Sequence, residues 1–170
     1  MLSVSTATPL QPIVDLLHEM HTLIERLDDV DYTMPAPGRS SGAIGGHVRH
    51  CLDHVNAVIA ATHTGICDYD RRVRGTDVEA DRGAAMRAIA DVIDVVQCLD
   101  QAAFDREIEV ESQLDRSGTT IMTRSTIGRE LVYVMSHTIH HNALVSMMLH
   151  ARGVGTEPRF GVAPSTPDRS

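Results

Sequence analysis

Apolar residues recur at helical spacing in four long segments of the chain. The first follows the prolines at positions 9 and 12, where the apolar residues from Ile13 to Leu27 share one helical face. Four amphipathic segments joined by loops predict an all-α protein with a four-helix bundle architecture. The other three predicted helices cover about residues 41–63, ending near Gly65, then 76–99, and finally 126–153, where Gly153 suits a helix C-cap.

The segments between these helices carry turn signals. Residues 28–42 contain two prolines and two glycines and are expected to form a loop. Thr76 is followed three residues later by Glu79, the spacing of a capping box, which we expect to begin the third helix. Alternating apolar and polar residues around Asp115–Gly118 predict a short β-hairpin between the third and fourth helices.

The length of 170 residues suits one domain, which we expect to span residues 1–170. Its core is expected over about residues 10–153, and the tail, 154–170, is rich in proline and serine and should be irregular. Aromatic residues make up only 3% of the chain and tryptophan is missing, so the core must be aliphatic. That palette favours helices over a β-sandwich.

Charge and cysteine content narrow the expected partners and location. The formal net charge of −8 disfavours nucleic acid or an anionic membrane as a partner, because both need a basic surface. There is no apolar run long enough for a signal peptide or a transmembrane helix. Three cysteines without paired spacing are typical of reduced thiols, which favours a cytoplasmic location.

Six of the ten histidines are concentrated in two clusters, one on each of two predicted helices. His137 and His141 are four residues apart, so their rings can aim two nitrogens at one point. His47, His50 and His54 share one side of the second helix, within roughly 60°. A half-buried histidine is more often a hydrogen-bonded core group, and one such cluster is easily explained by chance. Two clusters are not, and two facing helices are the usual place for a metal site in a bundle.

Three neutral imidazoles around a divalent ion leave one coordination position open for water or substrate. That arrangement is typical of a catalytic zinc site rather than a closed structural one. Imidazole also accepts nickel, iron and manganese, so the ligand type alone does not fix the metal. Spacing does not choose among His47, His50 and His54 as the third ligand.

Two stretches, "AIGGHVRHCLDH" at 43–54 and "SHTIHHNALVSMMLHARGV" at 136–154, resemble the DinB-like or YfiT-like superfamily of metal-dependent enzymes. The resemblance covers about residues 10–153 and implies a four-helix bundle, often dimeric, with one histidine ligand on the second helix and a His-x3-His pair on the fourth. In the family motif the ligand follows an isoleucine by six residues, so Ile44 points to His50. The pair carries over to His137 and His141, with zinc or nickel as the expected metal.

The chain departs from the family pattern after the last predicted ligand. Many relatives continue with Arg-Gly-Gln, whereas this chain has Asn142-Ala143-Leu144. The second helix also carries more histidines than the family motif needs. Both departures concern the substrate and leave the predicted triad in place.

Other side chains could orient the ligands or bind substrate. Asp53 could hold His50 or His54 by a hydrogen bond, or it could be a solvated surface acid. His54 and His47 are further candidates beside the predicted ligands. The arginines of the loop "DYDRRVRG", Arg72 among them, could bind a substrate carboxylate, although surface ion pairs are their commoner role.

The resemblance implies two chemistries, transfer or isomerisation with a low-molecular-weight thiol, and hydrolysis. In either, the ion would act as a Lewis acid toward a bound water or thiol. We favour thiol-dependent transfer of a small-molecule substrate, because no protein nucleophile is expected near the triad. The competing class is a non-catalytic, stress-related bundle that binds a metal or a small molecule, favoured if His54 or His47 is a fourth ligand. Family habit also favours a homodimer.

Overall fold

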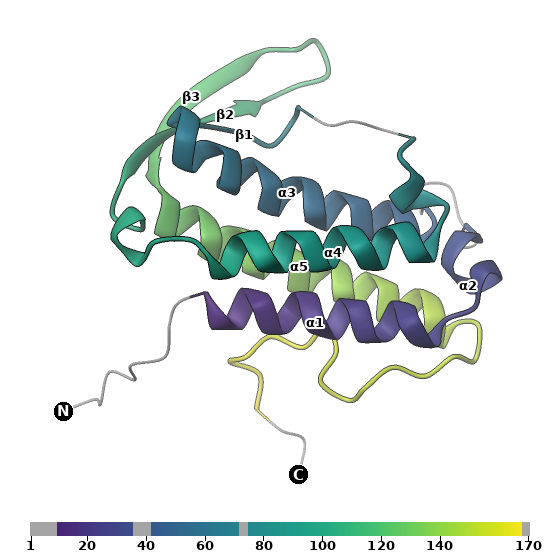
Figure 1. Ribbon diagram of the computed structural model, residues 1–170. Helices are drawn as coiled ribbons and strands as arrows, with labels where there is room; N and C mark the ends of the chain where they lie inside the picture. Colours follow the sequence, from purple (N-terminus) through teal and green to yellow (C-terminus); the bar gives the residue numbers. More distant parts are fainter. Residues whose placement is uncertain (1–9, 36–41, 72–74, 168–170) are drawn as a thin grey trace.

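Four long helices form the bulk of the molecule (Figure 1). The computed structural model describes residues 10–35, 42–71 and 75–167. The long helices in it are α1 Gln11–Arg26, α3 Ile44–Thr64, α4 Arg82–Gln97 and α5 Ile127–His150. Both α1 and α3 pack against α4 and α5. The chain is therefore mostly helical, as the spacing of its apolar residues predicts.

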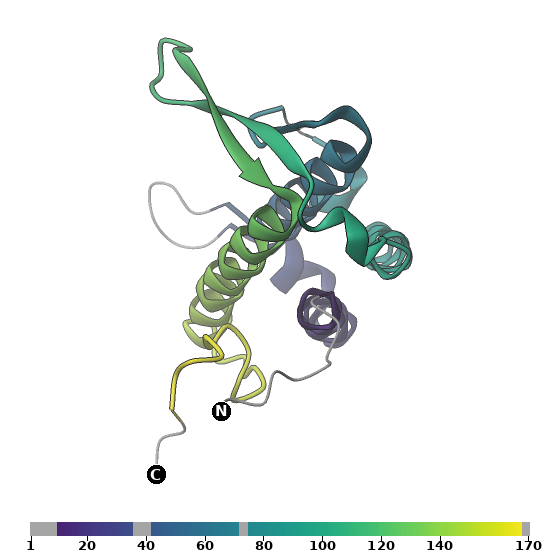
Figure 2. The same ribbon diagram turned by 90° about the vertical axis from the view of Figure 1, so that its left-hand side faces the viewer.

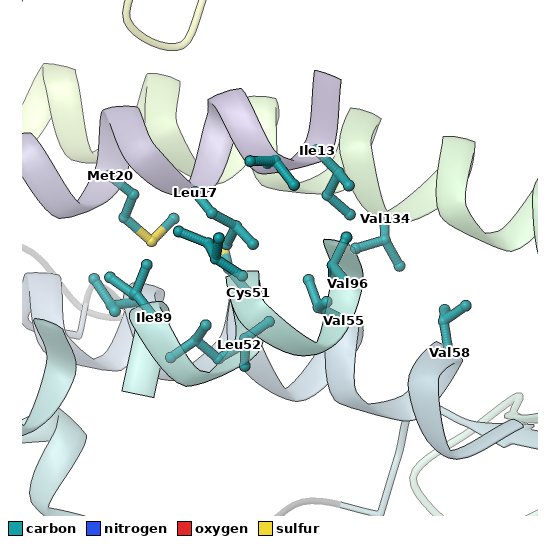
Figure 3. Packing of buried hydrophobic residues seen from close by; sticks show 14 of the residues in the cluster. Ile13, Leu17, Met20, Cys51, Leu52, Val55, Val58, Ile89, Val96 and Val134 are labelled. Carbon is teal, nitrogen blue, oxygen red and sulfur yellow. The ribbon is translucent and has the colours of Figure 1, made fainter. Parts of the chain in front are cut away.

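The core between the helices is built from aliphatic side chains (Figure 3). Leu17 of α1, Cys51 of α3 and Ile89 of α4 are fully buried members of this one cluster. Removing a large aliphatic side chain from water contributes about 1.5–3 kcal/mol to stability. Burial also raises the pKa of the Cys51 thiol to about 12, so this cysteine is a protonated core group.

The ends of the long helices follow from local side chains. Gly65 ends α3 with a φ of 75°, which a residue with a side chain rarely adopts. At the start of α5, the hydroxyl of Thr126 accepts a hydrogen bond from the backbone N–H of Arg129. No helix in the described part of the chain has the length and hydropathy to cross a bilayer.

The predicted capping box at the start of the third helix is wrong. Thr76 precedes only a single 3₁₀ turn, η1 Asp77–Glu79, and its side chain makes no capping hydrogen bond. The Glu79 carboxylate instead lies 2.7 Å from the guanidinium of Arg49 on α3. The N-cap of α4 is Asp81, whose carboxylate accepts from the backbone N–H of Ala84.

A small three-stranded sheet covers one end of the helices. Its strands are β1 Ile66–Asp68, β2 Glu107–Gln113 and β3 Thr120–Thr126, in the order β1-β2-β3. The predicted hairpin is confirmed, because β2 and β3 pair antiparallel, and Figure 2 shows it extending beyond the helices. The parallel strand β1 is an addition to the prediction, since three residues are too few to show a period of two.

Residues 28–42, expected to be a loop, contain the short helix α2 Asp29–Thr33. The Asp28 carboxylate caps it by accepting from the backbone N–H of Asp31. Tyr32 is fully buried and its hydroxyl donates to the carbonyl of Val78, 2.6 Å away. This pairing fixes α2 against the turn that precedes α4. Residues 36–41 of the expected loop lie outside the described residues.

The described part of the tail, residues 154–167, contains neither helix nor strand but packs against the helices. Phe160 is buried, and Glu157 lies 2.5 Å from Arg26 of α1. Gly161 touches α5 so closely that a Cβ there would lie 2.4 Å from the backbone nitrogen of Ala143. The remaining short element is a 3₁₀ turn, η2 Gln101–Ala103.

Candidate metal centre

The histidines of α3 and α5 contact one another in pairs between the two helices. His50 and His137 face each other with their Nε2 atoms 2.8 Å apart. His47 and His141 form the next pair, with their Nδ1 atoms also 2.8 Å apart. His47 precedes His50 on α3, whereas its partner His141 follows His137 on α5, so the two helices run antiparallel. The two sequence clusters are therefore brought together.

His54 lies one turn beyond His50 on α3 and is 4% exposed. Its Nδ1 is 2.9 Å from the backbone carbonyl of His50. A carbonyl only accepts, so Nδ1 carries the proton, and a neutral ring then has its lone pair on Nε2. One ring nitrogen each of His50, His54 and His137 lies within 4.8 Å of the other two, which makes this trio a candidate metal site.

The orientations of the rings group the histidines differently from the distances between their nitrogens. The rings of His50, His137 and His141 meet at steep angles of 67°, 73° and 64°, with centroids 4.6–4.9 Å apart. His54 instead stacks on His137, with centroids 4.2 Å apart and planes 18° apart. An imidazole donates its lone pair in the plane of the ring. Two stacked rings therefore cannot both direct a lone pair at one ion, whereas inclined rings are able to. His141 is not part of the trio whose ring nitrogens lie within 4.8 Å of one another, so its grouping with His50 and His137 rests on ring inclination.

The donor set of this cluster fits a divalent first-row metal ion. Burial lowers the pKa of His141 to about 3, helped by the neighbouring His137, and burial also lowers the pKa of His47. Neutral rings are the form that binds metals. Two imidazole nitrogens on one tetrahedral zinc ion lie roughly 3.3 Å apart. The contact between His50 and His137 needs to open by only about half an ångström to reach that separation.

Two tyrosines form a wall on one side of the cluster. Tyr69, which follows β1, stacks on His54 with centroids 4.9 Å apart and planes 17° apart. Tyr133 of α5 stacks on His137 at 5.7 Å and 24°. The two phenol rings also contact each other, with centroids 5.3 Å apart. This wall limits how the rings of His54 and His137 can turn.

A fully buried carboxylate holds the tyrosine wall in place. Glu130 accepts from the Tyr69 hydroxyl at 2.6 Å, from Ser125 at 2.5 Å and from Arg129 at 2.8 Å. A buried charge is costly unless it is hydrogen-bonded, and the first turn of a helix favours a negative charge. Burial and this carboxylate raise the pKa of Tyr69, so its phenol remains a donor.

Glu130 was not among the candidates predicted from the sequence. Its position offers one signal, because it falls on the apolar face of α5 between Ile127 and Val134, both fully buried. An acid on such a face must be paired, and its partner is not visible in the sequence. Tyr69 is 61 residues away along the chain.

Comparison with known structures identifies the fold. The crystal structure of a DinB-like protein, YjoA from Bacillus subtilis, matches 88% of this chain and 94% of that chain, with a TM-score of 0.63 and 19% sequence identity. The fold is DinB-like. The resemblance predicted from two short motifs is thereby confirmed for the fold, which is all that a likeness at this identity establishes. No family model matches the sequence.

One curated relative shares part of the sequence. FK506-binding protein 5 of Rhizopus delemar is 30% identical over 108 residues, which are 63% of this chain. The match spans only 28% of the relative's length, so the name of that whole protein assigns no activity to this DinB-like chain.

The remaining candidates occupy different places in the DinB-like fold. Asp53 lies 2.5 Å from Arg49, one turn earlier on α3. His47 contacts His141, and His54 contacts His137, as described above. Arg72 lies outside the described residues.

Proposed function

We propose that this protein is a metal-dependent enzyme in which His50, His137 and His141 bind one divalent ion, zinc or nickel. The observation that carries the proposal is the steep mutual inclination of these three rings, 64–73°, at centroid distances of 4.6–4.9 Å. When bound, such an ion supplies Lewis acidity and lowers the pKa of a water or thiol in its open position.

The other two histidines have supporting roles in this proposal. The Nδ1 atoms of His47 and His141 are 2.8 Å apart, which leaves Nε2 of His141 for the ion. His54 fills the space between Tyr69 and His137 and holds the His137 ring by stacking. Substituting a residue that orients a ligand ring in this way commonly lowers metal affinity by about 10–100-fold. Three ligands leave one position open for a small molecule.

The reaction that we propose is transfer with a low-molecular-weight thiol. The chain's own thiols near the site are poor nucleophiles, because burial raises the pKa of Cys51 to about 12 and that of Cys67 to about 11. A thiol from solution would lose its proton to solvent, and its sulfur would bond to an electrophilic carbon of the second substrate. The leaving group departs with the electrons of the bond that breaks.

The metal part of the proposal is tested by elemental analysis. Wild type and His150→Ala, an exposed histidine in the last turn of α5, should each hold about one ion per chain. His137→Ala should hold only traces. Equal metal content in His137→Ala and His150→Ala would overturn the site. The transfer part fails if the zinc- or nickel-loaded protein neither binds nor transfers glutathione, mycothiol or bacillithiol.

One observation favours a second candidate, a closed and non-catalytic metal site. A ring nitrogen of His54 lies within 4.8 Å of those of His50 and His137, close enough for a fourth ligand after a ring rotation. X-ray absorption on the zinc-loaded protein separates the two candidates. Three imidazoles and one donor other than imidazole favour the enzyme, whereas four imidazoles that become three in His54→Ala favour the closed site.

A further inference from the structure

A polar pocket of about 370 Å³ lies beside the histidine cluster. It is bordered by β2, β3 and the first turns of α5. Tyr69 and Tyr133 line it, and the same two rings stack on His54 and His137. The pocket and the histidine cluster therefore share a wall. A molecule in the pocket would approach the histidines by passing these rings.

Hydrogen-bond donors dominate the inner surface of this pocket. Arg129 uses one of its five N–H groups on Glu130, and its guanidinium carbon lies 5.5 Å from the centre of the Tyr133 ring. The side chain of Arg129 is 66% exposed, so its other N–H groups are within reach of a ligand. Within the described residues, the hydroxyls of Ser112, Thr123 and Tyr133 have no hydrogen-bond partner.

The negative charge in the pocket is already satisfied. Glu130 accepts from three donors and is fully buried, so it offers little to a cationic ligand. Its pairing with Arg129 cancels one positive charge, which makes the pocket too weakly positive for a phosphate dianion. A carboxylate carries a single charge and fits the planar guanidinium. Arg124 also borders the pocket, and it stands opposite Glu109 in the sheet register.

The geometry of α5 connects this pocket to the metal centre. Arg129, Tyr133, His137 and His141 are spaced by four residues, so they follow one another along one side of the helix. Eight residues separate Arg129 from His137, which is about 12 Å along the helix axis. A ligand held at Arg129 must therefore be elongated to place its reacting atom at the histidines.

We infer that this pocket binds the carboxylate of one reactant, an elongated small molecule whose reacting atom lies on the order of 10 Å from that carboxylate. The inference rests on the proposed function, because it assigns a substrate class to the same site. Arg129 is the residue that recognises the carboxylate. The hydroxyls of Ser112, Thr123 and Tyr133 supply further donors.

The test compares hexanoate with its uncharged counterpart hexanamide, by NMR titration of full-length protein freed of metal with a chelator. Without an ion, the carboxylate has only the pocket to bind. Wild type should bind hexanoate at least about tenfold more tightly than hexanamide, the difference expected from one charge-assisted contact. Arg129→Gln should abolish the preference and Arg129→Lys should keep part of it. Arg87→Gln, an exposed arginine on α4 that does not line the pocket, should leave it unchanged.

Two results would overturn the inference, equal affinity for hexanoate and hexanamide in wild type, or an undiminished preference in a folded Arg129→Gln protein. Because Arg129 also pairs with Glu130, the fold of each variant is checked by its amide spectrum, and Arg129→Lys keeps the charge if Arg129→Gln unfolds. Failure of the proposed function appears separately, as no zinc bound when the same preparations are reloaded with zinc.

Further probes on the zinc-loaded protein identify which reactant carries the carboxylate. If it is the thiol, 6-mercaptohexanoate should bind at least about tenfold more tightly than 6-mercaptohexanol, and Arg129→Gln should remove the gain. If it is the electrophile, hexanoate and 6-mercaptohexanol should bind together without competing. Competition between the two, with no gain from joining thiol and carboxylate, would contradict the inference.

Discussion

His54 and His137 stack face to face across α3 and α5, with ring centroids 4.2 Å apart and planes 18° apart. This stack separates the role of His54 from that of His141, whose ring meets His137 at 64°. In the proposed site, His54 supports a ligand ring, and His141 is itself a ligand. The distinction leads to different expected losses of metal affinity when His54 and His141 are substituted.

Substituting the stacking histidine should weaken metal binding without abolishing it. We expect His54→Ala to keep one ion per chain with an affinity about 10–100-fold lower, as for other groups that orient a ligand. His141→Ala removes a ligand and should reduce affinity by more than that. Competition with a chromophoric chelator measures both. The assignment would be reversed if His54→Ala lost the ion and His141→Ala kept it.

The buried carboxylate of Glu130 should be important for stability. Glu130→Gln keeps the shape of the side chain but gives Tyr69, Ser125 and Arg129 a neutral partner, one end of which is itself a donor. We expect a loss of about 2–4 kcal/mol in the free energy of unfolding, measured in urea. Glu25→Gln, an exposed position on α1, is the matched control and should change stability by less than about 0.5 kcal/mol. An equal effect of the two substitutions would contradict this account.

Removing one hydroxyl tests the anchor of α2. Tyr32→Phe should cost about 1–3 kcal/mol, because the buried hydroxyl donates to the carbonyl of Val78 and no other donor is at hand for that oxygen among the described residues. Tyr133→Phe is the control, since its hydroxyl has no partner in the described part of the chain and the ring stays in place. A similar cost for both would show that the hydrogen bond contributes little.

The sequence predicts the parts of this site that depend on helical period. Spacing alone places His47, His50 and His54 on one side of α3, and His137 and His141 one turn apart on α5. It does not predict how the rings are inclined, because that depends on how α3 and α5 pack and on the tyrosines behind them. The stack on His54 comes from Tyr69, in a segment whose strand is only three residues long.

The wrong capping box has a similar cause. The local pattern of Thr76 and Glu79 is sound, but Arg49 of α3 lies close enough to bind the Glu79 carboxylate. Glu79 pairs with Arg49 and accepts from the backbone N–H of Gly75, whereas the Thr76 hydroxyl makes no capping hydrogen bond. Asp81, two residues further on, then caps α4 instead. Local signals of this kind are reliable only where no distant charge competes for the side chain.

The lowered pKa of His141 predicts a pH dependence for the metal-free protein. A folded-state pKa of about 3, against an ordinary value of 6.5, means that the unfolded chain binds a proton which the folded chain does not. Stability should therefore fall as the pH drops from 6.5 toward 3, and not above 6.5. His47 acts in the same direction. Urea unfolding of chelator-treated protein at pH 7.5 and 5.5 measures the effect, and His141→Gln should reduce it.

Two glycines of the tail test whether it is part of the folded unit. Gly161 has a φ of 73°, and a Cβ there would lie 2.4 Å from the backbone of Ala143. Gly161→Ala should therefore destabilise the protein by about 1–3 kcal/mol, through strain and displacement of the tail from α5. Gly155→Ala is the matched control, because nothing lies within 4 Å of its Cβ position and its φ is not positive.

Since Phe160 is buried beside Gly161, Gly161→Ala should also expose that ring. Urea unfolding and limited proteolysis within residues 154–167 measure both effects. Unchanged stability and unchanged cleavage in Gly161→Ala would mean that the tail contributes nothing to the fold.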